Sequence, residues 1–342
     1  MIADARVLQP EFVPRDVVHR DHQLQYLASI LDPVLEERST EPVMLTGKSG
    51  TGKTCIARFA VERLRENMLE VNTAYVNCWR HHSQYKTLHQ LLDAIDKAWD
   101  IHRQSTPRDV LMDRLVEYDG PPFVIILDEV DQLDDLGVLY DLSRIPAISL
   151  ILIANNEHDV FGRLDERVRS RLNSASTINF KPYSTGEMTS ILEDRVTWGL
   201  APDAITEEQV HFIADSAAGD ARTAIGILRA SSQRAQNLGL DELTSDILEE
   251  AVPSAEREIK QNDLDRLTPH QETLYEIITD AGEIAPKELY EVYESLVERP
   301  RSNRTVRTYL SKLEHYGLIE SSGNTRQRVY RTTDAKGNAL TH

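Results

Sequence analysis

The sequence predicts an α/β domain built on a parallel sheet, followed by a helical lid and a C-terminal winged-helix domain. Up to Phe180, short apolar runs alternate with longer amphipathic stretches, as is typical of a parallel sheet covered by helices. After Pro182 the strand signals stop and helical patterns take over. From Pro269 to Thr333, three helical patterns precede a strand–turn–strand pattern.

The α/β domain is expected to span residues 1–182. Its candidate strands are aliphatic or β-branched, and several are bounded by Gly, Pro or Asn. These strands are Val43–Thr46, Ala74–Asn77, Phe123–Leu127, Leu150–Ala154 and Thr177–Phe180. Between them, Lys53–Glu66 and Thr87–Trp99 carry helical patterns.

The rest of the chain divides into a lid and a smaller domain. The lid, residues 183–253, is predicted to contain four helices: Thr185–Thr197, Thr206–Ala217, Asp220–Gln236 and Leu243–Ala251. The segment 254–268 is charged and weakly apolar, which predicts a linker. The winged helix then covers 269–333, and 334–342 form a tail.

Length and composition exclude several classes of protein. A chain of 342 residues fits two or three domains. Its two cysteines, Cys55 and Cys78, are too few for a disulfide framework or a zinc site, which favours a reducing, cytoplasmic setting. Met1–Phe12 carries acids and no apolar core, so we expect no secretory signal. Because no apolar run reaches the length of a bilayer span, we expect no membrane partner.

Charge is distributed unevenly along the chain. The formal net charge is -18, which by itself opposes binding to phosphate-rich partners. Between Arg299 and Arg331, however, eight arginines and lysines face two glutamates, a local net charge of +6. The acidic remainder fits either adaptation to high salt or an ordinary acidic cytoplasmic protein, and composition leaves both open.

A complete phosphate-binding loop follows the first strand. Its sequence is Gly47-Lys48-Ser49-Gly50-Thr51-Gly52-Lys53-Thr54, which matches G-x-x-x-x-G-K-[ST] between a strand and a helix. Glycines let successive backbone N–H groups and the helix N-terminus point at an anion. Lys53 is expected to contact the β- and γ-phosphates of ATP, and the Thr54 hydroxyl to ligate Mg²⁺. The motif predicts a nucleotide site.

Polar residues end the third and fourth predicted strands. Asp128 and Glu129 follow Phe123–Leu127, where Asp128 can hold Mg²⁺ through water and Glu129 can polarise an attacking water. An acidic pair at a strand end is often only solvated, but here it follows a phosphate loop. Asn155 and Asn156 follow Leu150–Ala154. An amide there can sense the γ-phosphate, although Asn-Asn is also a turn signal.

Taken in order, these motifs resemble AAA+ ATPases, and more narrowly the archaeal Orc/Cdc-type replication initiators. The resemblance covers nearly the whole chain. It rests on Asn77-Cys78-Trp79, on Phe180-Lys181-Pro182-Tyr183 and on Gly219-Asp220-Ala221-Arg222. The run from Phe12 to Arg20 is similar to the family's adenine-side segment, which implies nucleotide contacts for Val18, Arg20 and Tyr183.

The resemblance also implies roles for single residues. Asn155 corresponds to a first sensor, with Asn156 as the fallback, and Arg222 to a second sensor in the lid. Arg171 corresponds to an arginine finger acting on a neighbouring copy's nucleotide, with Arg167 as the second choice.

The C-terminal domain is the candidate DNA-binding part. Ser302–His315 reads as a helix with Ser302 as N-cap and an apolar stripe of Val306, Tyr309, Leu310 and Leu313. The other side carries Arg304, Arg307, Thr308 and Ser311, which suit a major groove. Arg326 and Arg328 lie on a β-wing able to touch phosphates. The alternatives are protein contacts or a solvated basic face. For the basic, aromatic segment Trp79–Lys86, a second DNA contact and core packing are equally open.

Together with these features, the resemblance implies an ATP-dependent initiator of DNA replication. We expect it to bind double-stranded origin DNA, to assemble with other initiator copies and to help recruit the replicative helicase. ATP and ADP with Mg²⁺ are expected to act as a switch, with slow, regulatory hydrolysis. An AAA+ winged-helix transcription regulator is the alternative, and an adaptor whose wing binds protein is a third.

Overall fold

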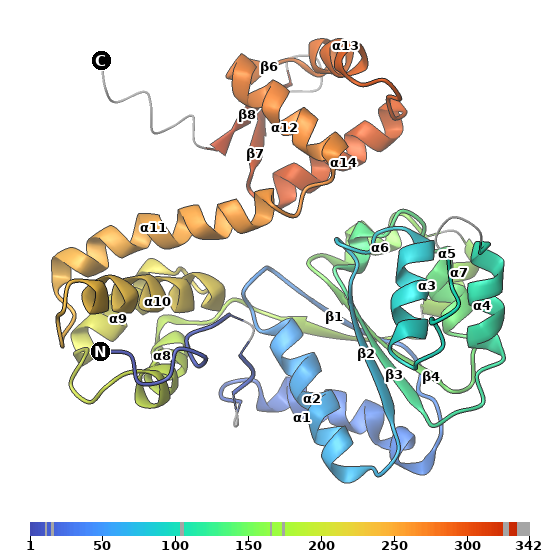
Figure 1. Ribbon diagram of the computed structural model, residues 1–342, viewed down its shortest axis with the longest axis horizontal. Coiled ribbons are helices and arrows are strands. Elements are labelled where there is room, and N and C mark those ends of the chain that lie inside the picture. The colour runs from blue at the N-terminus through green and yellow to red at the C-terminus, as the bar shows by residue number, and fades with distance from the viewer. Residues whose placement is uncertain are drawn as a thin grey trace. The chain divides into compact units, whose positions relative to one another are not determined.

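The computed structural model describes residues 1–10, 12–14, 17–102, 106–164, 166–172, 175–323 and 328–333 (Figure 1). The chain forms two units, Met1–Ala255 and Glu256–His342. The first contains the parallel sheet and the lid, and the second contains the winged helix. The predicted fold class is confirmed.

Five parallel strands form the sheet in the order β2-β3-β4-β1-β5. Each predicted strand is present with its ends shifted by two residues at most: β1 (Val43–Gly47), β2 (Asn72–Asn77), β3 (Phe123–Asp128), β4 (Ile148–Ala154) and β5 (Ser176–Phe180). Every residue of the central strands β3 and β4 is buried, which explains their continuous apolar runs. Since the strands are parallel, their carboxyl ends meet at one edge of the sheet.

Helices cover both faces of the sheet (Figure 1). One core lies under α1 (Asp21–Leu31) and α2 (Lys53–Asn67), where it contains Val124 and Ile126 of β3. The alternate β3 residues Phe123, Ile125 and Leu127 belong to the opposite core. The helices packed on that second core are α3 (Gln84–Asp93), α4 (Arg108–Val116), α5 (Gly137–Leu142), α6 (Glu157–Phe161) and α7 (Glu166–Leu172).

Two short 3-10 helices, η1 (Asp32–Glu36) and η2 (Val130–Gln132), also belong to the α/β domain.

The helix predicted for Thr87–Trp99 ends earlier, at Asp93, and Trp99 is 87% exposed. Trp79 is buried, so it packs in the core.

The lid contains three of the predicted helices, α8 (Thr185–Gly199), α9 (Glu207–Ser216) and α10 (Ala221–Asn237), and the first part of the fourth, α11 (Ser245–Leu264), which continues past the end of the first unit at Ala255. Ser184 with Glu187, and Thr206 with Gln209, form capping boxes that start α8 and α9. The N-terminal segment 1–10 packs here too: Leu8 is part of the lid core. Although we predicted residues 1–182 as one α/β domain, the first ten residues therefore share the core of the lid.

The predicted linker 254–268 is helical over most of its length, and the boundary between the two units falls at its start, after Ala255. Helix α11 runs without interruption through Pro253 to Leu264. A proline inside a helix removes one backbone hydrogen bond and usually breaks the helix. Here the buried stripe of Ile247, Ala251 and Ala255 continues past the proline at helical spacing, so side-chain packing outweighs that cost.

The second unit has the winged-helix order of elements. It comprises α12 (Pro269–Ala281), β6 (Glu283–Ile284), α13 (Pro286–Leu296), α14 (Asn303–His315), β7 (Ile319–Ser322) and β8 (Val329–Thr332), with an antiparallel sheet in the order β6-β8-β7. The Ser302 hydroxyl accepts the Thr305 N–H at 3.3 Å, which confirms Ser302 as the N-cap of α14. Across the described ranges, no helix combines the length and apolar composition that crossing a bilayer requires.

Candidate functional site

The phosphate loop joins the end of β1 to the start of α2. Gly50 (φ 71°) and Gly52 (φ 92°) take left-handed conformations that side chains disfavour. A Cβ atom on residue 50 would lie 1.8 Å from Asp220 Oδ1, and one on residue 52 would lie 2.4 Å from Tyr183 Oη. Both glycines are therefore required by the backbone turn. Their missing side chains also leave room for Asp220 and Tyr183, which lie close to the loop.

Lys53 lies inside the loop with 7% of its surface exposed. Its Nζ donates to Gly47 O at 2.6 Å, to Lys48 O at 2.8 Å and to Asn155 Oδ1 at 3.0 Å. Burial lowers the pKa of Lys53 to about 8, although the negative charge of Asp128 opposes this shift. An ammonium group held on weak carbonyl partners is well placed to exchange them for phosphate oxygens.

Asp128 ends β3 beside the first turn of α2. The Thr54 hydroxyl donates to Asp128 Oδ2 at 2.8 Å, and the Tyr75 hydroxyl donates to the same oxygen at 2.9 Å. Burial, followed by the charge of Asp128, raises the pKa of Tyr75, so this phenol stays protonated. Sequence reasoning missed Tyr75. Its bond to Asp128 depends on the pairing of β2 with β3, which no local sequence pattern shows.

This donor set suits Mg²⁺. The described residues contain no group of three or more His, Cys, Asp or Glu side chains that could enclose a metal ion. Mg²⁺ needs no such cage, because it commonly takes one or two protein oxygens and completes its shell with phosphate and water. A hydroxyl and a carboxylate 2.8 Å apart, as in Thr54 and Asp128, fit that requirement.

Glu129 follows Asp128 in a left-handed conformation, with φ 57°. Such a backbone is uncommon and costly for a residue with a side chain. The turn starts η2, so the chain leaves the strand abruptly after Asp128. Asn155 lies just beyond β4, and its hydrogen bond from Lys53 brings the candidate sensor to the loop.

The lid contacts the phosphate loop through the N-terminus of α10. Asp220 caps this helix, because its Oδ1 accepts the Arg222 N–H at 2.8 Å. The backbone N–H of Ala221 donates to Gly50 O at 3.0 Å, and the Arg222 guanidinium donates to Ser49 Oγ. The structure thus brings Arg222 to the loop from a segment about 170 residues away in sequence.

Arg20 lies at the joint between sheet and lid. Its guanidinium, 4% exposed as a residue, lies 4.0 Å from the Tyr183 ring centroid and 5.6 Å from that of Phe180. It also donates to Lys181 O at 2.6 Å. Val18 is 39% exposed. Of the three implied adenine-side residues, Arg20 and Tyr183 are therefore stacked on each other, and Val18 faces solvent.

The two candidate finger residues lie on α7. The side chain of Arg171 is outside the described residues. The guanidinium of Arg167 lies 5.7 Å from the Tyr140 ring centroid, and Arg144 approaches the same ring at 5.5 Å. Arg167 is therefore held on the surface of the α/β domain by an aromatic ring.

Helix α14 of the winged helix presents two faces. Val306, Leu310 and Leu313 are buried, and Tyr309 packs against them, as predicted. The remaining predicted side chains are accessible: Arg304, Arg307 and Ser311 are exposed, and Thr308 is half-buried. Within the described residues, neither Arg304 nor Arg307 forms an ion pair.

The β-wing arginines differ from those of α14. Arg328 pairs with Glu314 at 3.1 Å and donates to Ser321 Oγ at 3.0 Å, so its charge is already compensated. Arg326, the other predicted wing contact, lies outside the described residues.

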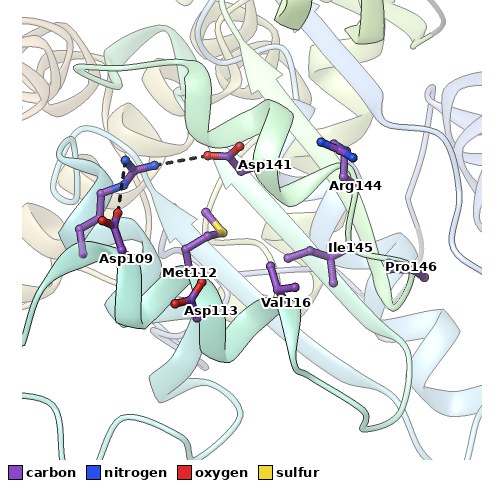
Figure 2. A pocket seen from close by; sticks show the side chains of 9 residues that line it. Asp109, Met112, Asp113, Val116, Asp141, Arg144, Ile145 and Pro146 are labelled. Atoms are coloured by element: carbon purple, nitrogen blue, oxygen red, sulfur yellow. Dashed lines mark hydrogen bonds and ion pairs between the residues drawn. The ribbon is translucent and has the colours of Figure 1, made fainter.

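A separate pocket of about 560 Å³ opens between α4 and the end of α5 (Figure 2). Arg108 pairs with Asp141 across it at 3.3 Å, and its apolar lining includes Met112, Val116 and Ile145. No phosphate-loop or sensor residue lines this pocket, so it is distinct from the nucleotide site.

The sheet, the phosphate loop, the acidic strand end and the contacting lid define an AAA+ ATPase. Residues 16–153 match the family model of the AAA ATPase domain, and residues 189–256 match that of the Cdc6 AAA+ ATPase-type lid domain. Among curated proteins, ORC1-type DNA replication protein 9 of Halobacterium salinarum is 48% identical over 341 residues, covering 100% of this chain and 96% of the relative. ORC1-type DNA replication protein 1 of the same organism is 52% identical, covering 90% of this chain and 100% of the relative. The chain belongs to the Orc1/Cdc6-type family of archaeal DNA replication initiators.

Solved structures agree with this assignment. The Aeropyrum pernix ORC1 protein in complex with DNA superposes with a TM-score of 0.76 and 25% identity, covering 97% of this chain and 94% of that one. The Aeropyrum pernix ORC2 protein, solved as ADPNP–ADP complexes, has a TM-score of 0.66 and 23% identity, covering 98% and 95%. The likeness to the ORC2 protein supports the fold alone.

Proposed function

We propose that this protein is an ATP-dependent replication initiator that binds origin DNA and switches state with its nucleotide. The observation that carries the proposal is the meeting of Lys53, Thr54, Asp128 and Asn155 at one sheet edge, with Arg222 of the lid on the same loop. These groups can recognise a triphosphate from both the sheet and the lid, so the bound nucleotide would set the position of the lid.

The residues of the site have distinct roles in this proposal. Lys53 would exchange its carbonyl partners for the β- and γ-phosphates, and Thr54 and Asp128 would hold Mg²⁺. When bound, Mg²⁺ neutralises charge on the phosphates. Glu129 orients the attacking water, and Asn155 binds the γ-phosphate and so couples its presence to the loop.

Hydrolysis is proposed to be slow and regulatory. Arg222 would stabilise charge from the lid of the same chain, and Arg171 would do so from a second initiator copy. An arginine supplied in trans makes hydrolysis depend on assembly, so that assembly can regulate the nucleotide switch. Val18, Arg20 and Tyr183 would frame the base.

The winged helix is proposed to read double-stranded origin DNA. Arg304, Arg307, Thr308 and Ser311 lie on the accessible side of α14, as a major-groove helix requires. Arg326 and Arg328 would contact the backbone from the wing. Support comes from the Aeropyrum pernix ORC1 protein, whose structure was solved with DNA. A chromosomal partner implies a nucleoid-associated cytoplasmic protein, and recruitment of the replicative helicase would follow on the DNA.

The proposal is tested in the source cells by chromatin immunoprecipitation and sequencing of the tagged protein, alongside replication profiles. Peaks at replication starts are expected, and they should weaken for an Arg304→Ala/Arg307→Ala variant expressed at the same level. Peaks confined to promoters, with replication starting elsewhere, would instead identify a transcription regulator.

A further inference from the structure

The nucleotide site contains a tyrosine to which no motif assigns a role. Tyr75 Oη and Thr54 Oγ1 lie 2.9 and 2.8 Å from the same acceptor, Asp128 Oδ2. We propose that Tyr75 is a positioning residue for the metal site: its hydroxyl fixes the Asp128 carboxylate so that Oδ1 is presented to the metal ion and its water. This inference rests on the proposed function, since it requires that the site binds a nucleotide with a divalent cation.

The strand register explains how Tyr75 reaches this carboxylate. Tyr75 pairs with Ile126 on β3, so Asp128 lies two residues further along the neighbouring strand. Ala74 and Val76 point into the core under α3 and α4, which turns Tyr75 to the opposite face, that of α2. Asp128 and Ile126 share that face. A side chain as long as tyrosine can span such a diagonal between adjacent strands.

Helix α2 holds the tyrosine ring in place. The Arg58 guanidinium lies 4.0 Å from the ring centroid of Tyr75, in the range of a cation–π contact. Arg58 follows Thr54 by four residues, so both side chains project from one side of α2. The same side of one helix therefore provides the hydroxyl that bonds Asp128 and the cation that orients Tyr75.

Two donors on one oxygen leave the other oxygen available. A carboxylate oxygen accepts two hydrogen bonds through its lone pairs, and Thr54 with Tyr75 supplies two for Oδ2. Among the described residues, Asp128 Oδ1 accepts no hydrogen bond. Fixing the carboxylate before the cation arrives removes a conformational cost of binding, and the loss of such supporting bonds typically weakens metal affinity by about 10- to 100-fold.

The test compares Tyr75→Phe with wild type in the full chain, using Mn²⁺ as the probe. Mn²⁺ binding to the ADP complex is followed by electron paramagnetic resonance, and a fluorescent ATP analogue measures nucleotide affinity in EDTA. We expect the Mn²⁺ dissociation constant of Tyr75→Phe to rise about tenfold. Affinity in EDTA should not change, because the ring stays on Arg58, and the thermal unfolding midpoint without metal should fall by only a few degrees, because one hydrogen bond to Asp128 is lost.

Two further variants complete the design. Tyr26→Phe removes the hydroxyl of a 48%-exposed tyrosine on α1 and should match wild type. Arg58→Met leaves Tyr75 intact but frees its ring, so a smaller rise in the Mn²⁺ constant is expected. Unchanged Mn²⁺ affinity in Tyr75→Phe overturns the inference, as does an equal loss of nucleotide affinity in EDTA. If wild type shows no nucleotide-dependent Mn²⁺ binding, the proposed function itself fails.

Discussion

Asp220 of the lid lies directly against Gly50 of the phosphate loop, where an added Cβ atom would meet its carboxylate at 1.8 Å. The backbone N–H of the neighbouring Ala221 donates to Gly50 O, so the lid also contacts the loop through its backbone. A carboxylate aimed at a phosphate loop would repel the anion, but Asp220 Oδ1 accepts two N–H groups at the start of α10. A change of the loop backbone at residue 50 would therefore displace the N-terminus of α10.

Gly50→Ala should uncouple lid and loop. The left-handed backbone at residue 50 costs about 1–2 kcal/mol with a side chain, and the new methyl group displaces Asp220. We expect ATP affinity, measured with a fluorescent analogue, to fall by about tenfold or more. Gly186→Ala in α8 is the control, since nothing lies within 4 Å of its added Cβ atom. Equal affinity in the two variants would show that the contact has no part in binding.

The pKa of Lys53 predicts how ATP affinity depends on pH. With burial holding this pKa at about 8, the free protein loses the ammonium charge as pH rises through 8. Phosphate favours the charged form, so the complex keeps its proton to higher pH, and affinity falls as pH rises. Measured in EDTA, ATP should bind about tenfold more weakly at pH 9 than at pH 7.

Lys53→Arg separates this effect from other titrations, because its guanidinium stays charged over the same range. Its ATP affinity, although altered, should be flat from pH 7 to 9. A slope equal to that of wild type would assign the pH dependence to another group.

Contiguous motifs made much of this fold and site predictable. The phosphate loop and the polar ends of β3 and β4 are each formed by a few consecutive residues. Because the strands are parallel, their carboxyl ends lie at one edge of the sheet. Ser302 was predictable as a cap because capping is a local hydrogen bond.

Other features depend on partners distant in the chain. Tyr75 gains its role from a residue 53 positions away, and no local pattern distinguishes it from any strand tyrosine. Helix α11 passes Pro253 because its apolar stripe is buried, whereas propensity alone predicts a break. The side chain of Arg171 lies outside the described residues, so its role stays a prediction.

Arg195 is expected to stabilise the first unit by attaching the N-terminal segment to α8. It is 5% exposed, and its guanidinium donates to Val7 O, to Gln9 O at 3.3 Å and to Phe12 O at 3.1 Å. Arg195→Met would leave these carbonyls without their donor, so the free energy of unfolding should fall by about 3 kcal/mol in urea denaturation. Limited proteolysis should also cut within residues 1–14 sooner.

Arg6→Met is the matched control for this variant. Among the described residues Arg6 pairs only with Asp4, and its side chain is 86% exposed, so its loss should leave stability and proteolysis unchanged. A similar loss of stability in both variants would contradict the role of Arg195.

The arginines of the winged helix should contribute unequally to DNA binding. Arg307 is exposed without an ion-pair partner among the described residues, whereas Arg328 is paired with Glu314. Arg307→Ala should therefore weaken binding to an origin duplex by about 1–3 kcal/mol, and it should lower the salt slope by about one if the contact is to phosphate. Arg328→Ala should cost less, because DNA must compete with Glu314 for its charge.

Fluorescence anisotropy over a salt series measures both the affinity for the duplex and the salt slope. Arg234→Ala in the lid, where Arg234 pairs with Glu250, is the control. If Arg234→Ala weakens binding as much as Arg307→Ala, α14 is not the main DNA contact.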